Sequence, residues 1–536
     1  MNGIIQHRDY QAESVLNTLK ALDSMDRVAV CLPTGAGKSI VISSIAHNLN
    51  GRVLILVHRR EILEQNAEWL DDVFVLDASS KFLKKTRIVI AMVETFNSRI
   101  KKHGHNYMGK FDSVIADECH ILVFDKVFRK LEVKKMIGFT ATPVINKKRR
   151  FEVDGVEFSQ EIAFSDFYQK LIQSVDTQDL IDRGFLVQER NVELLPHNFE
   201  NLKASESQPD GFTKDSLDEV YSSTASLEIL KKSYEDYGVG RKTIIFNANS
   251  SINLKVYKMF KDMGVECMFF DSVNSEHIPI NEATGKKYTR DEVVDWYKNT
   301  KDGLLINVSV FTTGFNVKDI GTVIVNRATK SLSLWLQIVG RGSRTTDKFY
   351  KDFFYCIDLG GNIQRHDIWS GRRDWQDYFY PKSPKPKKKL DIIQTWDCNS
   401  CFAINIVGET VCSECGEERL KSKVTKAPTT GKLVQRPTDL KPPSGVKIIE
   451  YCKRVGKGKN DAFKILESKI IELFRFYEVS QTDFLEKQDS YEARVIEIFR
   501  KAYHPINSSS LFGKYRRFST MQNQLLTKIR ESYGVE

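Results

Sequence analysis

A glycine-rich loop near the amino terminus has the residue types that hold phosphate groups. Residues 33–39, Pro-Thr-Gly-Ala-Gly-Lys-Ser, follow an apolar run and precede a helical pattern. Glycines let consecutive backbone N–H groups turn toward phosphate oxygens, and the start of the helix adds partial positive charge. Lys38 can neutralise β- and γ-phosphates, and Ser39 has a hydroxyl suited to Mg²⁺. We therefore expect an ATP and Mg²⁺ site formed by Thr34, Gly35, Ala36, Gly37, Lys38 and Ser39.

Two adjacent carboxylates end another apolar run, Ser-Val-Ile-Ala. Asp117 is placed to bind Mg²⁺, and Glu118 is placed to orient and deprotonate an attacking water. His120 follows two residues later, where a helix-start or packing role would be reasonable if it stood alone. The pair predicts phosphoryl transfer to water, with Asp117 and Glu118 as catalytic residues.

A third cluster contains Gln337, Gly340, Arg341 and Arg344 in a helical pattern. Because Arg341 and Arg344 are three residues apart, a helix would place them on one face. Guanidinium groups suit the charge that develops on a γ-phosphate, so we expect Gln337, Arg341 and Arg344 to be catalytic. Taken in isolation, the two arginines are more typical of an exposed surface pair.

The elements around these motifs predict two α/β domains. Residues 27–142 and 242–359 each alternate short apolar runs with helical stretches. The runs are too uniformly apolar for strands with one exposed face, so they indicate parallel sheets covered by helices on both faces. Two doubly wound domains follow from this pattern. The arginines then lie in a different domain from the phosphate loop, and they can act only if the domains close on the nucleotide.

Shifts in composition give the expected segment boundaries. Residues 196–220 are polar and contain Gly and Pro, as expected of a surface loop. The expected segments are a first domain over 1–160, a second over 161–379, a basic linker over 380–394, a cysteine module over 395–420, a second linker over 421–446 and a helical region over 447–536.

Four of the nine cysteines form two C-x-x-C pairs separated by ten residues. Each pair presents two thiolates in one turn, and tetrahedral Zn²⁺ needs four such ligands. We expect a zinc ribbon rather than disulfides or a redox pair, because no thioredoxin-like context surrounds either pair. The predicted ligands are Cys398, Cys401, Cys412 and Cys415.

Length, charge, hydrophobic content and cysteine positions limit the class of protein to which this chain can belong. The chain has 536 residues, a formal net charge of +10 and 41% hydrophobic residues. No apolar run approaches the roughly 20 residues of a membrane span, and no secretory signal is visible. Five scattered cysteines favour a reducing compartment, so we expect a cytoplasmic protein, in the host cytoplasm if a phage encodes it. The basic excess suits a polyanionic partner.

In combination the motifs resemble superfamily 2 helicases of the DEAD/H type, from about Arg8 to about Asn362. The resemblance implies two RecA-like lobes, with Arg8 and Gln11 recognising adenine and Gly314 near the nucleotide. It also implies that Thr140, Thr142 and His120 couple hydrolysis to strand binding. The implied nucleic-acid contacts are His58, Arg59, Gln65, Thr95, Thr312 and Thr313.

Closer still, the segments GFTATP, FTTGFNV and QIVGRGSR resemble bacterial RadD-type and related phage helicases. Such proteins also carry cysteine-rich zinc modules after the motor, and the likeness implies a role in DNA replication, recombination or repair. One departure is Asn316, where relatives usually carry Asp after Thr-Gly-Phe. The change removes a charge near the interlobe site, which bears on coupling rather than on ATP hydrolysis.

The expected function is an ATP- and Mg²⁺-dependent motor acting on nucleic acid, with single-stranded or junction DNA preferred. An RNA helicase and a translocase that moves on duplex without separating strands are the enzyme alternatives. A non-hydrolysing binding protein is the alternative from another class, and the intact Lys38, Glu118 and Arg341 argue against it. The helical region over 447–536 is the expected contact for replication or repair proteins, and no membrane partner is expected.

Overall fold

The computed structural model describes residues 7–380 apart from short gaps, and only short segments after them. The gaps are 78–79, 81–85, 105–108, 122–130, 132, 146, 154–155, 196–201, 206–209, 272, 283, 309–310, 312–314 and 316. Beyond 380 the described residues are 385–386, 395–397, 404–406, 432–435, 448, 452, 459–476, 495–496, 499 and 518–532.

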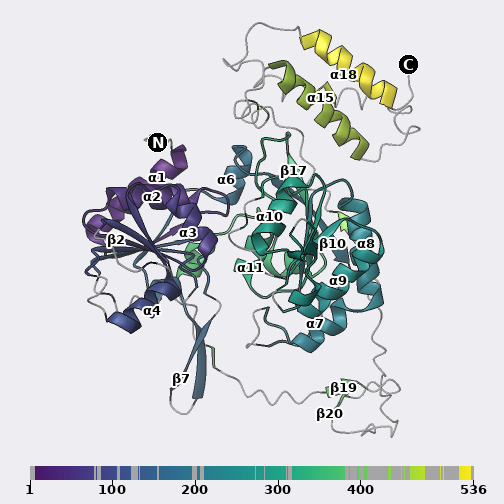
Figure 1. The fold of residues 1–536 in the computed structure, drawn as a ribbon. Coiled ribbons are helices and arrows are strands. Elements are labelled where there is room, and N and C mark those ends of the chain that lie inside the picture. Colours follow the sequence, from purple (N-terminus) through teal and green to yellow (C-terminus); the bar gives the residue numbers. More distant parts are fainter. Residues whose placement is uncertain are drawn as a thin grey trace.

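The first lobe is built on a seven-stranded sheet in the order β3-β4-β2-β5-β6-β1-β9, and every neighbouring pair is parallel. Its strands are β1 (Arg27–Cys31), β2 (Val53–Val57), β3 (Val73–Leu76), β4 (Ile88–Met92), β5 (Ser113–Asp117), β6 (Lys135–Thr140) and β9 (Lys170–Gln173). The central strands are fully buried because helices cover both faces of the sheet. These helices are α1 (Asp9–Ser24), α2 (Lys38–Asn48), α3 (Arg60–Ala67) and α4 (Val93–His103) (Figure 1).

The second lobe lies beside the first (Figure 1) and holds a sheet in the order β12-β15-β11-β16-β17-β10-β21. Its strands are β10 (Gln188–Leu195), β11 (Thr243–Asn247), β12 (Cys267–Phe269), β15 (Leu304–Asn307), β16 (Thr322–Asn326), β17 (Phe353–Asp358) and β21 (Lys432–Gln435). Only the β10–β21 pair is antiparallel among these strands. Its main helices are α7 (Lys214–Tyr221), α8 (Thr224–Tyr237), α9 (Ser250–Asp262), α10 (Arg290–Asn299) and α11 (Leu332–Val339).

Shorter elements complete the two lobes. They are η3 (Phe164–Asp166), α6 (Thr177–Asp182), η5 (Ser275–His277), β13 (Ile280–Asn281), β14 (Lys286–Lys287), α12 (Asn362–His366) and α13 (Gln376–Phe379). An antiparallel hairpin of β7 (Lys148–Val153) and β8 (Val156–Glu161) leaves the first lobe immediately after the loop that follows β6. None of the described helices is long and apolar enough to cross a membrane.

The prediction of two α/β lobes with parallel sheets is confirmed, while the structure differs from the expected segments in four places. The first sheet extends past residue 160, because β9 pairs with β1. The expected surface loop over 196–220 contains the start of α7, whose N-cap Thr213 accepts a hydrogen bond from the backbone N–H of Ser216. The two expected linkers each contribute a strand, since β18 (Lys385–Pro386) pairs with β8 and β21 pairs with β10.

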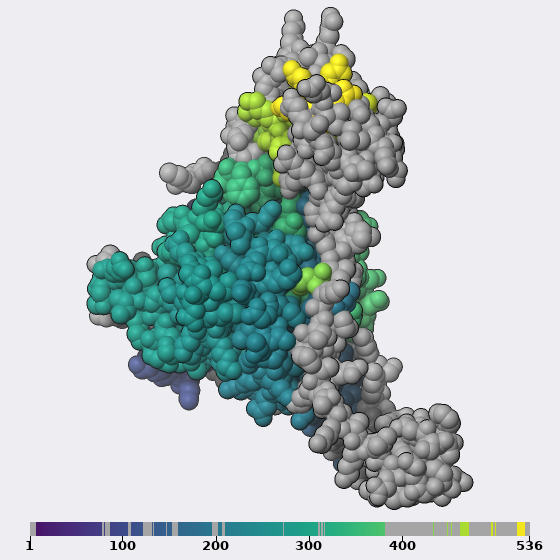
Figure 2. All heavy atoms as spheres, turned by 90° about the vertical axis from the view of Figure 1, so that its right-hand side faces the viewer, coloured from purple at the N-terminus to yellow at the C-terminus, as the bar shows by residue number. Residues whose placement is uncertain are grey.

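The described part of the carboxy-terminal region contains two helices, α15 (Lys459–Phe476) and α18 (Phe518–Ser532). They lie at one end of the second lobe (Figure 2), where Lys469 forms an ion pair with Asp352 at 3.4 Å. Lys528 on α18 pairs with Glu467 on α15 at 2.6 Å. The helical pattern expected over 447–536 is therefore seen in these two segments.

Candidate nucleotide site between the two lobes

A cleft of about 340 Å³ opens between the lobes, and both lobes contribute side chains to it. Its volume is at the lower end of the range typical of small-molecule sites. The first lobe contributes the phosphate-loop segment and both acidic residues, and the second contributes the arginine cluster. The lining residues are Arg8, Thr34, Gly35, Gly37, Lys38, Ser39, Ile62, Gln65, Asp117, Glu118, Phe185, Leu186, Lys318, Gln337, Arg341, Arg344, Thr345 and Asp347.

The phosphate loop joins β1 to α2, as the sequence predicts. Gly37 is the N-cap of α2 and has a φ of 81°, in the left-handed region. A Cβ added there would lie 2.5 Å from Gln11 Nε2, so only glycine fits without a shift of that side chain. The carbonyl of Ala36 accepts hydrogen bonds from Gln11 Nε2 and the Tyr10 hydroxyl, both at 2.9 Å. Gln11 thus fixes the loop itself, as well as accepting from the backbone N–H of Arg8 at 3.0 Å.

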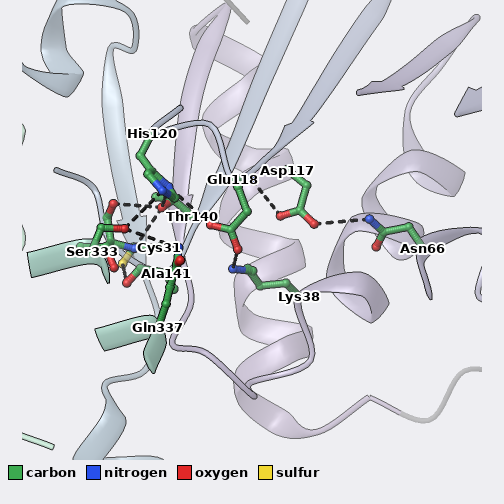
Figure 3. A network of polar contacts seen from close by, with 11 residues as sticks. Cys31, Lys38, Asn66, Asp117, Glu118, His120, Thr140, Ala141, Ser333 and Gln337 are labelled. Carbon is green, nitrogen blue, oxygen red and sulfur yellow. Dashed lines mark hydrogen bonds and ion pairs between the residues drawn. The ribbon is translucent and has the colours of Figure 1, made fainter. Parts of the chain in front are cut away.

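Lys38 and Glu118 form an ion pair at the floor of the cleft, with 2.6 Å between Nζ and Oε1 (Figure 3). Burial alone would raise the pKa of Glu118, but the neighbouring Lys38 and His120 hold it below its usual range. Burial would lower the pKa of Lys38, and the Glu118 and Asp117 carboxylates raise it instead. Both side chains are therefore charged in the absence of nucleotide. Glu118 also has a φ of 54°, an uncommon backbone conformation of the kind that collects at functional sites.

Asp117 is almost fully buried beside this pair. Its Oδ1 accepts from the backbone N–H of Glu118 at 2.9 Å, and its Oδ2 accepts from Asn66 Nδ2 at 3.3 Å (Figure 3). Burial raises the pKa of the Asp117 carboxyl, and a bound cation would favour its charged form. Asn66 lies on α3, and sequence reasoning missed it because one asparagine in a helical pattern carries no distinguishing signal.

His120 connects the two lobes. Its Nδ1 lies 3.0 Å from Thr140 Oγ1 in the first lobe, and its Nε2 lies 3.2 Å from Ser333 Oγ in the second (Figure 3). Gln337 Nε2 donates to the same Ser333 hydroxyl at 3.5 Å, one helical turn further along α11. Burial lowers the pKa of His120, which favours the neutral ring.

The predicted coupling residues Thr140 and Thr142 are both buried at the end of β6. Thr140 Oγ1 accepts from the backbone N–H of Thr142 at 2.9 Å and donates to the Thr142 carbonyl at 3.0 Å. A chain of contacts therefore runs from this turn through His120 to α11 in the other lobe.

Arg341 and Arg344 reach the cleft from a turn, not from the helix that was predicted. Helix α11 ends at Val339 because the Gly340-Arg341-Gly342 sequence is unfavourable to helix. The two side chains still converge, since both Nη1 atoms donate to the Phe315 carbonyl, at 2.8 Å and 2.9 Å. Burial lowers the pKa of Arg341 to about 9 and that of Arg344 to about 10, so an anion in the cleft would stabilise both guanidinium groups.

An aromatic ring at one end of the cleft was not predicted. Phe185 follows α6 between the lobes, and the Arg8 guanidinium lies 4.1 Å from its ring centroid. Arg8 also donates to the Tyr10 hydroxyl at 3.1 Å. Arg8 and Phe185 both line the cleft, and the adenine-binding role expected of Arg8 stays a prediction.

The structure places the predicted strand contacts in different surroundings. Gln65 lines the nucleotide cleft with Ile62, three residues earlier on α3, and its expected contact with a nucleic-acid strand stays a prediction. His58 lies close enough to Glu118 to feel its charge, and burial lowers the pKa of His58 to about 4. Arg59 and Thr95 are partly buried at the starts of α3 and α4. Thr312, Thr313, Gly314 and Asn316 lie outside the described residues.

The four predicted zinc ligands, Cys398, Cys401, Cys412 and Cys415, also lie outside the described residues. Within the described ranges, no three His, Cys, Asp or Glu side chains group as a metal site. The other five cysteines are buried, and the structure places none of these five in a disulfide. This agrees with the absence of a disulfide framework among them.

The cleft has the features that ATP with Mg²⁺ requires. The loop glycines and Lys38 face the side where phosphates would lie, and Ser39 and Asp117 supply the two oxygens suited to the metal ion. Glu118 Oε2 is buried and makes no hydrogen bond among the described residues, with His120 Nδ1 3.4 Å away, so it can accept from a water molecule. Opposite these groups stand two guanidinium groups, and hydrolysis of a phosphoanhydride needs this combination.

Comparison with known proteins places the two lobes in known families. A family described as type III restriction enzyme, res subunit, matches residues 4–145, and the helicase conserved C-terminal domain matches residues 225–346. A 51.5 kDa protein of a Lactococcus phage is 26% identical over 392 residues, covering 72% of this chain and 77% of its own length.

Two further relatives have descriptive names. A putative ATP-dependent helicase of Saccharomyces cerevisiae is 25% identical over 378 residues, covering 66% of this chain. The chain spans 51% of the length of that yeast protein. A DNA 3′–5′ translocase of Sulfurisphaera tokodaii is 23% identical over 381 residues, covering 64% of this chain and 80% of its own length.

Proposed function

We propose that this chain is an ATP-dependent helicase of superfamily 2, and that its lobes form a DNA motor driven by ATP hydrolysis in the cleft between them. The observation that carries the proposal is the meeting of Lys38 and Glu118 of the first lobe with Arg341 and Arg344 of the second in one cleft. Neither lobe alone supplies both halves of this site.

We assign the roles as follows. Lys38 and the loop N–H groups bind the β- and γ-phosphates, and Ser39 and Asp117 hold Mg²⁺, which neutralises charge on the phosphates. Glu118 orients the attacking water and accepts its proton. Arg341 and Arg344 stabilise the negative charge that develops during transfer. Before that step, Lys38 must exchange its Glu118 partner for phosphate, which leaves Glu118 free to act on water.

Coupling to nucleic acid is proposed to run through the His120 contacts. Thr140 and Thr142 lie on the first-lobe side of His120, and Ser333 lies on the second-lobe side. A strand that binds across both lobes favours the closed arrangement, in which the arginines meet the phosphates. Hydrolysis weakens that arrangement, and alternating closure and opening moves the lobes along one strand.

DNA is the proposed substrate. The net charge of +10 suits a phosphate backbone, and the Sulfurisphaera relative is named a DNA translocase. A strand-displacement assay with labelled DNA and RNA duplexes carrying single-stranded overhangs tests this proposal. We expect ATP-dependent displacement on DNA and at least tenfold less on RNA. Displacement on RNA alone would contradict the DNA assignment. ATP-dependent displacement of a triplex-forming strand, without duplex separation, would identify a duplex translocase instead.

We further propose one Zn²⁺ per chain, held by Cys398, Cys401, Cys412 and Cys415. Strands β19 (Thr395–Asp397) and β20 (Ile404–Ile406) pair antiparallel directly on either side of the first cysteine pair, which supports a knuckle there. Elemental analysis of protein purified under reducing, zinc-replete conditions should give about one zinc per chain. Replacing Cys412 with Ser should lower that content and leave the melting of the motor lobes unchanged. Absence of zinc in the wild type would rule out the ribbon.

A further inference from the structure

The turn that carries Arg341 and Arg344 is held through its backbone. Lys351 Nζ donates to the carbonyls of Gly342 at 2.5 Å and Arg344 at 3.2 Å. The carbonyl between them, that of Ser343, accepts from the backbone N–H of Val187 at 2.7 Å. Three consecutive carbonyls of the turn are therefore fixed by groups outside it, and one ammonium group holds two of them.

The same ammonium reaches the segment that the arginine side chains contact. Lys351 Nζ lies 3.5 Å from the carbonyl of Lys318, three residues after the Phe315 carbonyl that accepts from both arginines. Beneath the turn, Gly342 packs so closely on Phe354 that an added Cβ would lie 2.1 Å from that ring. Lys351 thus ties together the two segments that determine where the arginine side chains point.

Lysine is an unusual residue to hold a turn from inside the protein, and Lys351 is only 8% exposed. Lysine is rarely buried to this extent, and removing an ammonium group from water is unfavourable. Burial lowers the pKa of Lys351 to about 7, with the Asp319 carboxylate acting in the opposite direction. An apolar side chain of the same length would fill this space without removing a charged group from water. What the ammonium adds here is its hydrogen bonds to the carbonyls of the turn.

We propose that Lys351 is a positioning residue for the arginine pair, which holds the turn at residues 340–344 so that both guanidinium groups face the nucleotide. Lys351 does not line the cleft, so it acts through the turn and not by touching ATP. The proposal rests on the function proposed above for Arg341 and Arg344.

The test replaces Lys351 with Met in the full chain, which keeps the stem and removes the ammonium. We expect the kcat of DNA-stimulated ATP hydrolysis to fall about 10²-fold, the scale expected when a catalytic group is displaced by about 1 Å. The KM for ATP, the affinity for single-stranded DNA without nucleotide and the melting temperature should stay close to wild type. Lys348→Met is the matched control: its ammonium, three residues earlier, is more than half exposed and pairs with Asp319, so its kcat should stay within about twofold of wild type.

A double-mutant comparison separates positioning from a general structural role. In an Arg344→Ala background, Lys351→Met should lower kcat by less than about fivefold, because the group it positions is largely gone. A wild-type kcat in Lys351→Met, or an undiminished 10²-fold loss in that background, would overturn the proposal. If the Met variant melts below the assay temperature, Lys351→Gln replaces it with the same two comparisons. A failure of Arg344→Ala itself to reduce turnover would instead count against the proposed function of the cleft.

Discussion

Replacing Arg344 with Ala should reduce DNA-stimulated ATP turnover by about 10³-fold or more, the scale known for arginine fingers. Arg344 belongs to the second lobe, and its guanidinium lines the cleft that contains the phosphate loop of the first. The loss should therefore appear in kcat, measured by steady-state hydrolysis with saturating single-stranded DNA. Binding of that DNA without nucleotide should remain nearly unchanged, because the proposed partner of Arg344 is the γ-phosphate.

Two further variants test whether the loss of turnover is specific to the Arg344 guanidinium. Arg344→Lys should rescue poorly, since an ammonium cannot reproduce the planar guanidinium fork. Arg372→Ala, which removes an arginine with a 70% exposed side chain from the same lobe, should stay within about twofold of wild type. If Arg344→Ala only lowered the melting temperature and kept stimulated turnover within a few-fold of wild type, Arg344 would be a structural residue.

Lys38→Ala and Glu118→Gln should both abolish measurable turnover but have opposite effects on nucleotide binding. Lys38→Ala removes the charge that neutralises phosphate, so the Kd for ATP should rise at least tenfold. Glu118→Gln removes the base that acts on water, a loss of about 10²- to 10⁴-fold in rate. It also removes the carboxylate that holds Lys38 at 2.6 Å, so ATP should bind at least as tightly as to wild type.

Equilibrium binding of a fluorescent ATP analogue, measured beside turnover, distinguishes the two variants. Asn66→Ala is a useful comparison, because it removes a hydrogen bond to Asp117 and leaves the Lys38–Glu118 pair in place. It should reduce turnover less than either variant. Wild-type turnover in Glu118→Gln would exclude Glu118 as the base, and weakened ATP binding in that variant would contradict the exchange of partners at Lys38.

The sequence predicts the parts of the fold that have a uniform hydrophobic pattern. The apolar runs of residues 27–142 and 242–359 form strands, because strands buried on both faces must be apolar throughout. These strands are β1, β2, β4, β5 and β6 in the first sheet and β11, β12, β15, β16 and β17 in the second. Strand β10 was missed because it contains Glu189, Arg190 and Asn191 in a fully buried position. Glu189 accepts two hydrogen bonds from Ser370, and the Arg190 guanidinium lies 3.3 Å from the Phe353 ring centroid. Such burial depends on partners far away in the chain, which a local pattern does not reveal.

In the candidate site, too, local patterns were predictable and contacts between distant residues were not. The phosphate loop was predictable because its glycines, Lys38 and Ser39 are contiguous, so their geometry is local. The contact of His120 with Ser333 was not, because it joins residues 213 positions apart and depends on how the lobes meet. The place of Gln65 in the cleft was not predictable for a related reason: the helical period gives its neighbours on α3 but not which side of the helix faces the nucleotide.

The central claim is that one nucleotide site is completed by two lobes, and that a nucleic-acid strand across both lobes favours its completion. The most direct measurement is steady-state ATP hydrolysis by the full chain with and without saturating single-stranded DNA. We predict slow turnover alone and at least a tenfold increase in kcat with DNA, lost in Arg344→Ala. Turnover that is equal with and without any nucleic acid, or that is stimulated equally in wild type and Arg344→Ala, would contradict the account.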